Sequence, residues 1–315
     1  MTAFFDTHCD TATRITKASA SLLENDFHIS LKKAEGFSPY IQVAAIFTTA
    51  FPEPSNERSY KTYKDSVVYF KEQCKLHSCD IITTAEELDK SVDNQKNGLS
   101  RAGFILCIED CTFLTSKELV DEVYSDGVRI LIPMWGNKNS LGSAHDVDGG
   151  LTDIGKSVLN YAASKNMILD ISHANATCAA ELMDIAEAHQ TPVIASHSNS
   201  REYFDHTRNL YRNQAERLAS LGGIAGHSLC IWHLEKDGKC DVKTVCENVV
   251  SLTKLMGKEN VCYGCDLDGT DLPEGVSDIT GIHLIHNEIS NALGKEAAEN
   301  ILFTNAYNKF KKFLK

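Results

Sequence analysis

Short runs of apolar residues alternate along the chain with longer segments in which apolar residues recur at helical spacing. The apolar runs predict strands over residues 4–10, 41–47, 103–109, 127–134, 167–173, 192–197, 222–229 and 260–266. The segments between them predict helices over 59–76, 85–90, 117–124, 152–165, 176–189, 213–221 and 242–256, and residues 280–315 predict two more. Strands that alternate with helices in this way predict an α/β fold, a single (β/α)8 TIM-type barrel with extra C-terminal helices.

The helix over 152–165 opens with Thr152 or Asp153 as a possible cap. No stretch of the sequence has the composition of a linker, so we assign residues 1–315 to one domain. The chain has 315 residues, of which 43% are hydrophobic, and only 6 prolines, which is compatible with a large buried core.

Charge and hydropathy exclude some classes of function. The net charge of −12 argues against nucleic acid as a partner, because phosphate binding requires an excess of Lys and Arg on one face. No stretch approaches the roughly 20 apolar residues of a membrane span. The sequence enters its first predicted strand almost at once, which leaves no room for a cleavable signal. We therefore expect a cytoplasmic protein without a membrane partner.

The 11 cysteines are scattered and odd in number, which is typical of reduced thiols that pack as small hydrophobic groups. Cys262 and Cys265 form a C-x-x-C pair, which in other contexts binds zinc or carries out redox chemistry. Here the pair lies within an apolar strand and has no second pair to complete a zinc site, so we expect ordinary buried thiols.

Polar residues end the predicted strands. His8 and Asp10 are two positions apart, so on a strand they point to the same face, although a His-x-Asp pair alone is also common at a solvated strand end. In barrels of this class, the carboxyl ends of the strands carry the active site. Imidazole and carboxylate ligands without thiolate suit zinc and tolerate manganese, cobalt or iron. The sequence therefore predicts a metal centre built from strand-end residues: His8, Asp10, Glu109, His173, His197 and Asp266.

Several motifs, in order along nearly the whole chain, resemble those of the membrane dipeptidase family of dinuclear zinc peptidases within the amidohydrolase-like barrels. The segment 6–10, DTHCD, is similar to the family's D-G-H-N-D opening, and Glu109 in GFILCIED is similar to its bridging glutamate. The other matching segments are D-I-S-H at 170–173, S-H-S at 196–198, R-N at 208–209, G-C-D-L-D-G at 264–269 and Asn305.

The resemblance implies two zinc ions. His8 and Asp10 would hold one, His173 and His197 the other, and Glu109 would bridge both. Two adjacent cations repel unless an anion lies between them, which a bridging carboxylate supplies. A water bound to a single zinc has a pKa of about 7 instead of 15.7, so the implied nucleophile is hydroxide at neutral pH.

Two more roles follow from the resemblance. Asp266 would take the proton from the attacking water and pass it to the leaving amine, or would only orient a ligand histidine. Arg208 would bind the free carboxylate of a dipeptide, a task suited to its planar, bidentate guanidinium, whereas an arginine in a polar loop is otherwise usually solvated. Asp268 is expected to be structural.

The sequence departs from the family at the end of the fourth predicted strand, where a histidine thought to bind the scissile carbonyl is replaced by Trp135. An indole N–H donates one hydrogen bond but does not titrate, and its bulk would narrow a substrate pocket. His145 and His227 are alternative donors or bystanders.

We expect a metal-dependent dipeptidase with a small-molecule substrate, which could form a homodimer. The alternatives are a hydrolase of another amide that bears a carboxylate, such as an N-acyl amino acid, and a homologue that binds metal with reduced catalysis.

Overall fold

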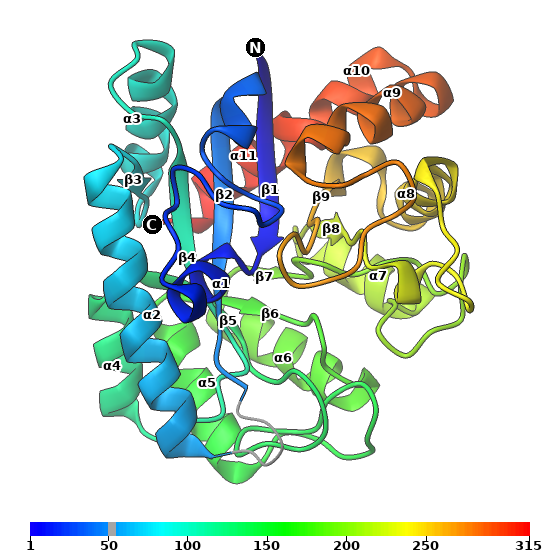
Figure 1. Ribbon diagram of the computed structural model, residues 1–315. Helices are drawn as coiled ribbons and strands as arrows, with labels where there is room; N and C mark the ends of the chain where they lie inside the picture. The colour runs from blue at the N-terminus through cyan, green and yellow to red at the C-terminus, as the bar shows by residue number, and fades with distance from the viewer. Residues whose placement is uncertain (50–54) are drawn as a thin grey trace.

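The computed structural model describes residues 1–49 and 55–315, and in this part of the chain eight parallel strands surround a common axis (Figure 1). Their order is β7-β6-β5-β4-β2-β1-β9-β8, and a parallel bridge between Ala195 and Ala225 joins the two ends. The sheet is therefore a nearly closed barrel, and the predicted fold class is confirmed. The strands are β1 (Thr2–Cys9), β2 (Phe37–Phe47), β4 (Gly103–Glu109), β5 (Val128–Ile132), β6 (Ile168–Asp170), β7 (Val193–Ile194), β8 (Ala225–His227) and β9 (Val261–Tyr263).

Helices cover the outside of the barrel and follow the sequence prediction closely. Thr152 caps α5, since its Oγ1 accepts a hydrogen bond from the amide of Gly155 at 2.9 Å. The α-helices are α1 (Thr11–Ala18), α2 (Asn56–Leu76), α3 (Ala85–Lys96), α4 (Lys117–Ser125), α5 (Asp153–Ser164), α6 (Ala176–His189), α7 (Arg212–Ser220), α8 (Val242–Met256), α9 (Ile282–Leu293), α10 (Lys295–Glu299) and α11 (Asn305–Phe313). A π-helical turn, Asn300–Thr304, joins α10 to α11, and short 3-10 turns lie at Lys33–Gly36, Ile231–His233, Lys258–Asn260 and Ile279–Gly281.

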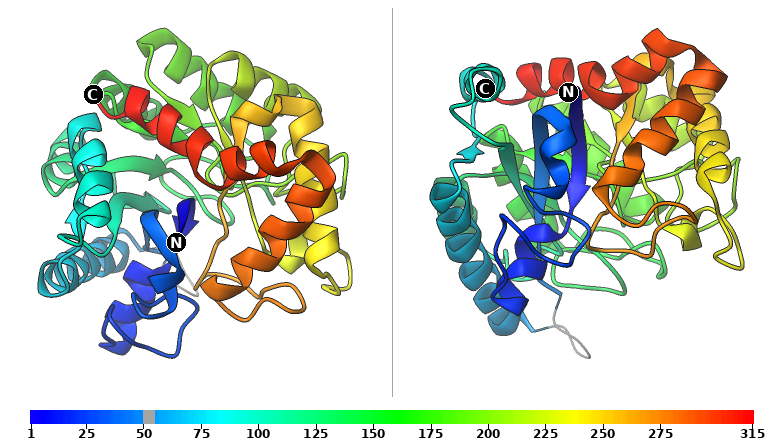
Figure 2. Two further views of the ribbon diagram at one scale, coloured as in Figure 1. Left: turned by 90° about the horizontal axis from the view of Figure 1, so that it is seen from above. Right: turned by 45° about the horizontal axis from the view of Figure 1, so that its top comes forward.

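The barrel interior is a separate apolar core. On β2, Ile41, Val43 and Ala45 point inward, while Ala44 and Ile46 belong to the outer core between the strands and the helices. The inner core includes Phe5, whose ring centroid lies 4.9 Å from that of Phe310 on α11. Seen from above, α11 crosses the end of the barrel at which β1 begins (Figure 2). The opposite end, toward which the strands run, is left for the site.

Two elements were not predicted. Helix α1 follows β1 directly, and β3 (Asp80–Ile81) pairs with the first residues of β4 beside the ring. Several strands are shorter than predicted because the backbone turns away at their polar ends, where His173 and Asp266 adopt left-handed conformations with φ of 69° and 60°. All 11 cysteines are free, and 10 of them are buried, which agrees with the prediction of packed thiols.

Candidate metal centre

Polar side chains from five strands meet at the carboxyl end of the barrel. His8 lies within β1, Glu109 ends β4, and the segments just after β1, β6, β7 and β9 carry the others. A cavity of about 430 Å³ opens above them. The structure thus brings together every residue that the sequence predicted for the metal centre: His8, Asp10, Glu109, His173, His197 and Asp266.

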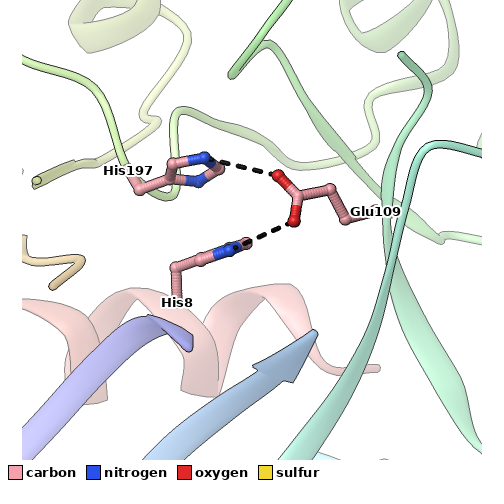
Figure 3. Close-up of side chains that lie close together, drawn as sticks. All are labelled: His8, Glu109 and His197. Atoms are coloured by element: carbon pink, nitrogen blue, oxygen red, sulfur yellow. Dashed lines mark ion pairs between the residues drawn. The ribbon is translucent and has the colours of Figure 1, made fainter. Parts of the chain in front are cut away.

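Glu109 is the centre of the cluster, and Figure 3 shows its carboxylate between two histidines. Oε2 lies 3.5 Å from Nε2 of His8. Oε1 lies 2.9 Å from Nε2 of His173 and 3.5 Å from Nε2 of His197. One oxygen therefore faces β1 and the other faces the loops after β6 and β7, so the carboxylate can be shared by two cations.

His173 and His197 present lone pairs to the same point. Nδ1 of His173 lies 2.8 Å from the carbonyl oxygen of Trp135, which can only accept, so Nδ1 carries the proton and Nε2 is free to act as a ligand. Nδ1 of His197 lies 2.9 Å from Oγ of Ser196. The two Nε2 atoms are 2.8 Å apart, and burial lowers the pKa of both imidazoles well below its usual range. Two neutral rings aimed at one carboxylate oxygen fit a metal cation.

The second half of the cluster lies around His8. Its Nε2 is 3.7 Å from Oδ2 of Asp10 and 3.8 Å from Oδ1 of Asp266. Among residues 1–49 and 55–315, neither Nε2 of His8 nor the buried Oδ1 of Asp10 has a hydrogen-bond partner. A Cβ atom at Gly269 would lie 2.0 Å from Asp10 Oδ2 and 2.3 Å from Asp266 Oδ1, so the close packing of these carboxylates requires glycine at that position.

The electrostatics of the cluster also fit cations. Burial raises the pKa of Glu109 and of Asp266, and the charge of Asp10 raises both further. Burial would lower the pKa of His8, but the carboxylates of Glu109 and Asp10 outweigh it and raise this pKa well above its usual value. A bound cation would favour the ionised carboxylates and the neutral imidazole that metal ligation requires.

Two buried aspartates that the sequence analysis did not single out hold the backbone beside the ligands. Oδ1 of Asp6 accepts hydrogen bonds from the amides of His8 and Cys265, at 3.3 and 2.8 Å. Oδ1 of Asp170 accepts from the amides of Ser172 and Ser196, at 2.8 and 3.1 Å. In the sequence, the one signal for these two aspartates is that each stands at the start of a motif that also contains a predicted ligand.

Arg208 reaches the same cavity from the loop after β7. Its side chain is buried, and Nη2 donates to the carbonyl oxygen of His197 at 3.1 Å. Within the described part of the chain, its Nε has no hydrogen-bond partner. Burial lowers the pKa of the guanidinium, whereas the charges of Glu109 and Asp266 raise it. A buried guanidinium with an unused N–H, lining a cavity, is suited to bind an anion.

Trp135 forms part of the cavity wall. Its ring packs edge-on against Phe47, with centroids 5.2 Å apart, and lies 6.0 Å from the ring of His173. His145 also lines the cavity, and its Nδ1 lies 2.8 Å from Oγ1 of Thr207.

The structure also shows where three other residues named in the sequence analysis lie. His227 is wholly buried on β8 against Tyr263, with ring centroids 4.4 Å apart, and does not line the cavity, so it is a bystander. Asp268 accepts hydrogen bonds from Oγ1 of Thr11 and the amide of His28, both at 2.6 Å, which is a structural arrangement. Asn305 fastens α11 to the barrel through the carbonyl oxygens of Lys258 and Val261.

The sequence analysis missed several lining residues, among them two cations and two aromatic side chains. Arg14 and Lys17 lie on the unpredicted helix α1, Phe47 ends β2, and His233 follows β8. The polar spacing of TATRITKA, with Ile15 buried and Arg14 and Lys17 exposed, is a weak helical signal that could have found the first two.

Known proteins are similar to this chain both in sequence and in fold. The family model described as "Membrane dipeptidase (Peptidase family M19)" matches residues 1–313. An uncharacterized Klebsiella pneumoniae protein encoded in the pqqA 5' region is 29% identical over 178 residues, which cover 53% of this chain and 65% of that protein. Human dipeptidase 3 is 27% identical over 164 residues, covering 51% of this chain and 33% of that protein. The match therefore spans less than two thirds of either relative.

Two solved structures have the same fold over nearly their whole length. One is a dipeptidase described as a metallopeptidase of family M19, and the other is a metallopeptidase from Rhodobacter sphaeroides bound to a phosphinate mimic of the dipeptide L-Ala-D-Ala. Each has a TM-score of 0.88 and 20% sequence identity, and covers 99% of this chain and 99% of its own.

Proposed function

Because the chain belongs to the membrane dipeptidase family, peptidase family M19, we propose that it is a metal-dependent dipeptidase whose catalytic centre is the cluster around Glu109. The family is one of peptide-bond hydrolases that use metal. The observation that carries the proposal is the position of Glu109, with one carboxylate oxygen facing His8 and the other facing His173 and His197.

The proposed cofactor is a pair of zinc ions, for which manganese, cobalt or iron could substitute. His8 and Asp10 would hold one ion, His173 and His197 the other, and Glu109 both. When bound, such ions supply an activated water as nucleophile and polarise the scissile carbonyl. The hydrogen bond between His173 and the carbonyl of Trp135 would fix the ligand tautomer.

Asp266 is the proposed proton carrier. It lies beside His8 and Asp10 and lines the cavity. Its carboxylate would accept a proton from the attacking water and deliver it to the leaving amine. Burial raises its pKa, which makes the carboxylate a stronger base toward the attacking water, and the acid that forms is still strong enough to protonate an amine.

Arg208 is the proposed contact for the substrate's free α-carboxylate. In a dipeptide this group is only one residue from the scissile bond, so a buried guanidinium beside the metal centre would select dipeptides over longer chains. The Rhodobacter sphaeroides relative, which binds a dipeptide mimic, is consistent with a substrate of this size.

One observation favours a second candidate function. Trp135, which by the resemblance in sequence takes the place of a family histidine, forms an aromatic wall with Phe47, and such a wall would suit an amide with an acyl group, such as an N-acyl amino acid. A metal-binding homologue with reduced catalysis is the third reading.

Turnover assays distinguish these readings. Zinc-reconstituted protein is offered a library of dipeptides and a matched set of N-acyl amino acids, with chelator-treated protein as the control. We expect zinc-dependent release of free amino acids from dipeptides. Hydrolysis confined to the N-acyl compounds would support the second function instead, and no turnover of either set would support the third.

Location and assembly stay predictions, as does the assignment of residues 1–315 to one domain. Among the described helices, none is long and apolar enough to cross a membrane. We propose a cytoplasmic protein that acts on a small molecule and could form a homodimer. The acidic net charge of −12 supports the absence of a nucleic-acid partner.

A further inference from the structure

Helix α1 places two cations on the wall of the catalytic cavity. Arg14 and Lys17 are three positions apart, so they share one face of the helix, and both side chains line the cavity and are exposed. The helix begins immediately after Asp10, so these two residues lie within two turns of a residue of the metal centre.

In the described part of the chain, neither cation is neutralised by a carboxylate. Within residues 1–49 and 55–315, no ion pair involves Arg14 or Lys17, although other cations of this acidic chain pair closely, as Lys61 does with Asp65 at 2.6 Å. Each lies instead over an aromatic ring: the guanidinium of Arg14 is 5.0 Å from the centroid of Phe27, and Nζ of Lys17 is 5.7 Å from that of Phe47. These contacts hold the side chains while their charges remain available.

The carboxylates that line the cavity are engaged elsewhere. Asp10, Glu109 and Asp266 belong to the metal cluster. Asp268 accepts from Thr11 and His28, and Oδ1 of Asp146 accepts from the amide of Asn137 at 2.9 Å. The charges of Arg14 and Lys17 are thus open to a ligand.

The strand order places Lys17 across the cavity from the loop that carries Arg208, and Arg14 lies one turn before Lys17 on the same helix. Phe47, under Lys17, ends β2, and Arg208 follows β7, which lies four strands from β2 in either direction around the ring. A substrate whose α-carboxylate binds Arg208 and whose scissile carbonyl lies at the metal centre would extend its amine-side residue toward α1.

We propose that Arg14 and Lys17 form a subsite for a second carboxylate, on the amine side of the substrate, as in dipeptides that begin with Asp or Glu. The inference rests on the proposed dipeptidase function and specifies its substrate class. A basic side chain at the same position meets like charge and is rejected. The same carboxylate could come from an acidic acyl group, as in an N-succinyl amino acid.

The test compares kcat/KM for Glu-Ala, Gln-Ala and Lys-Ala with zinc-loaded protein. Glu and Gln have the same shape, so their ratio isolates the charge. Since exposed ion pairs are weak in water, we expect Glu-Ala to be favoured over Gln-Ala by only about 3- to 10-fold. The ratio should shrink as salt is added, and Lys-Ala should be the poorest of the three.

Variants assign the effect to α1. In the double variant Arg14→Gln, Lys17→Gln, the Glu-Ala to Gln-Ala ratio should fall close to one. Lys17→Glu leaves the subsite without net charge, because Arg14 remains, and should bring Glu-Ala and Lys-Ala close together. The matched control is Lys61→Gln, which removes an exposed cation of α2 that does not line the cavity, and should leave the ratio as in wild type.

The outcomes separate the subsite from the proposed function. If neutral dipeptides are hydrolysed but the wild-type ratio is one, or the double variant keeps the wild-type ratio, the subsite is refuted and the dipeptidase stands. If no dipeptide is hydrolysed, the dipeptidase proposal fails. N-succinyl-alanine, compared with N-butyryl-alanine, then tests the acyl source: a preference for the succinyl compound that disappears in the double variant supports the subsite, and no preference refutes it.

Discussion

Asp6 and Asp170 occupy equivalent places on two distant strands of the barrel. In each case, Oδ1 accepts one hydrogen bond from the amide of the residue two positions later in the chain. It accepts a second from an amide just after the neighbouring strand. Asp6 thereby joins the backbone of His8 to the residue before Asp266, and Asp170 joins the backbone before His173 to the residue before His197. Each aspartate fixes the spacing of one half of the metal cluster.

This relationship predicts a specific stability loss at Asp170. Asp170→Ala leaves two buried amides without an acceptor, which should lower the free energy of unfolding by about 2 to 4 kcal/mol. Denaturant titration of the metal-free protein measures it. Asp170→Asn keeps an oxygen at the same place and should lose clearly less. Equal losses in the two variants would mean that these hydrogen bonds contribute little.

Glu109 should control metal content. Wild type is expected to bind about two ions per chain, as a shared carboxylate implies, and Glu109→Ala should fall well below that because the remaining ligands no longer have an anion between them. Elemental analysis after dialysis gives the stoichiometry. Glu216→Gln, which alters an exposed carboxylate on α7, is the control. Unchanged stoichiometry in Glu109→Ala would rule out the shared role.

Asp266 should affect turnover rather than metal. If it carries the proton, Asp266→Asn should retain both ions and a similar KM while kcat falls by about 10²- to 10⁴-fold. Steady-state kinetics and metal analysis on one preparation provide both readouts. Asp271→Asn removes an exposed carboxylate that lines a neighbouring pocket and not the catalytic cavity, so it should change kcat little. Loss of metal from Asp266→Asn would instead make Asp266 a ligand or a support for one.

Arg208 should discriminate the substrate's carboxylate. Arg208→Ala should weaken the binding of dipeptides by several kcal/mol, roughly the effect of removing one partner of a buried charge pair. Dipeptide amides, which lack that charge, should be poor substrates of both wild type and variant. Arg212→Ala, on the surface, is the matched control. Efficient hydrolysis of amides by wild type would contradict the proposed contact.

Trp135 should set the level of activity. Losing one hydrogen-bond donor to the developing oxyanion typically costs about 10²- to 10³-fold, so wild type should be slow and Trp135→His should gain. The gain will be small if the cavity wall has been rebuilt around the packing of the indole on Phe47. Trp135→Phe separates the roles of the side chain: a further fall in kcat identifies the indole N–H as a donor, and no change identifies the ring as filler.

The sequence revealed most of the barrel because buried parallel strands are short apolar runs. It located the cluster because His, Asp and Glu residues end several of these runs, where burying them without a partner would cost free energy. GFILCIE was predicted to the residue as β4, and α6 and α8 were too. Helix α1 was missed because its eight residues carry few apolar positions. The lengths of β6 and β9 were overestimated because left-handed turns at His173 and Asp266 depend on tertiary contacts. Asp6 was missed because its partner, Cys265, is distant in sequence.

The packing of α11 under the barrel also bears on how the chain is made. Phe5 leaves the ribosome long before Phe310, yet the two rings pack against each other in the finished barrel. Until then the inward face of β1 and β2 has no permanent cover, and contacts of such long sequence separation form slowly. The growing chain therefore presents apolar strands for much of its synthesis, and such a state is prone to aggregation. Final assembly of the metal cluster would then follow release of residues 305–314, after translation of the segment that seals the barrel.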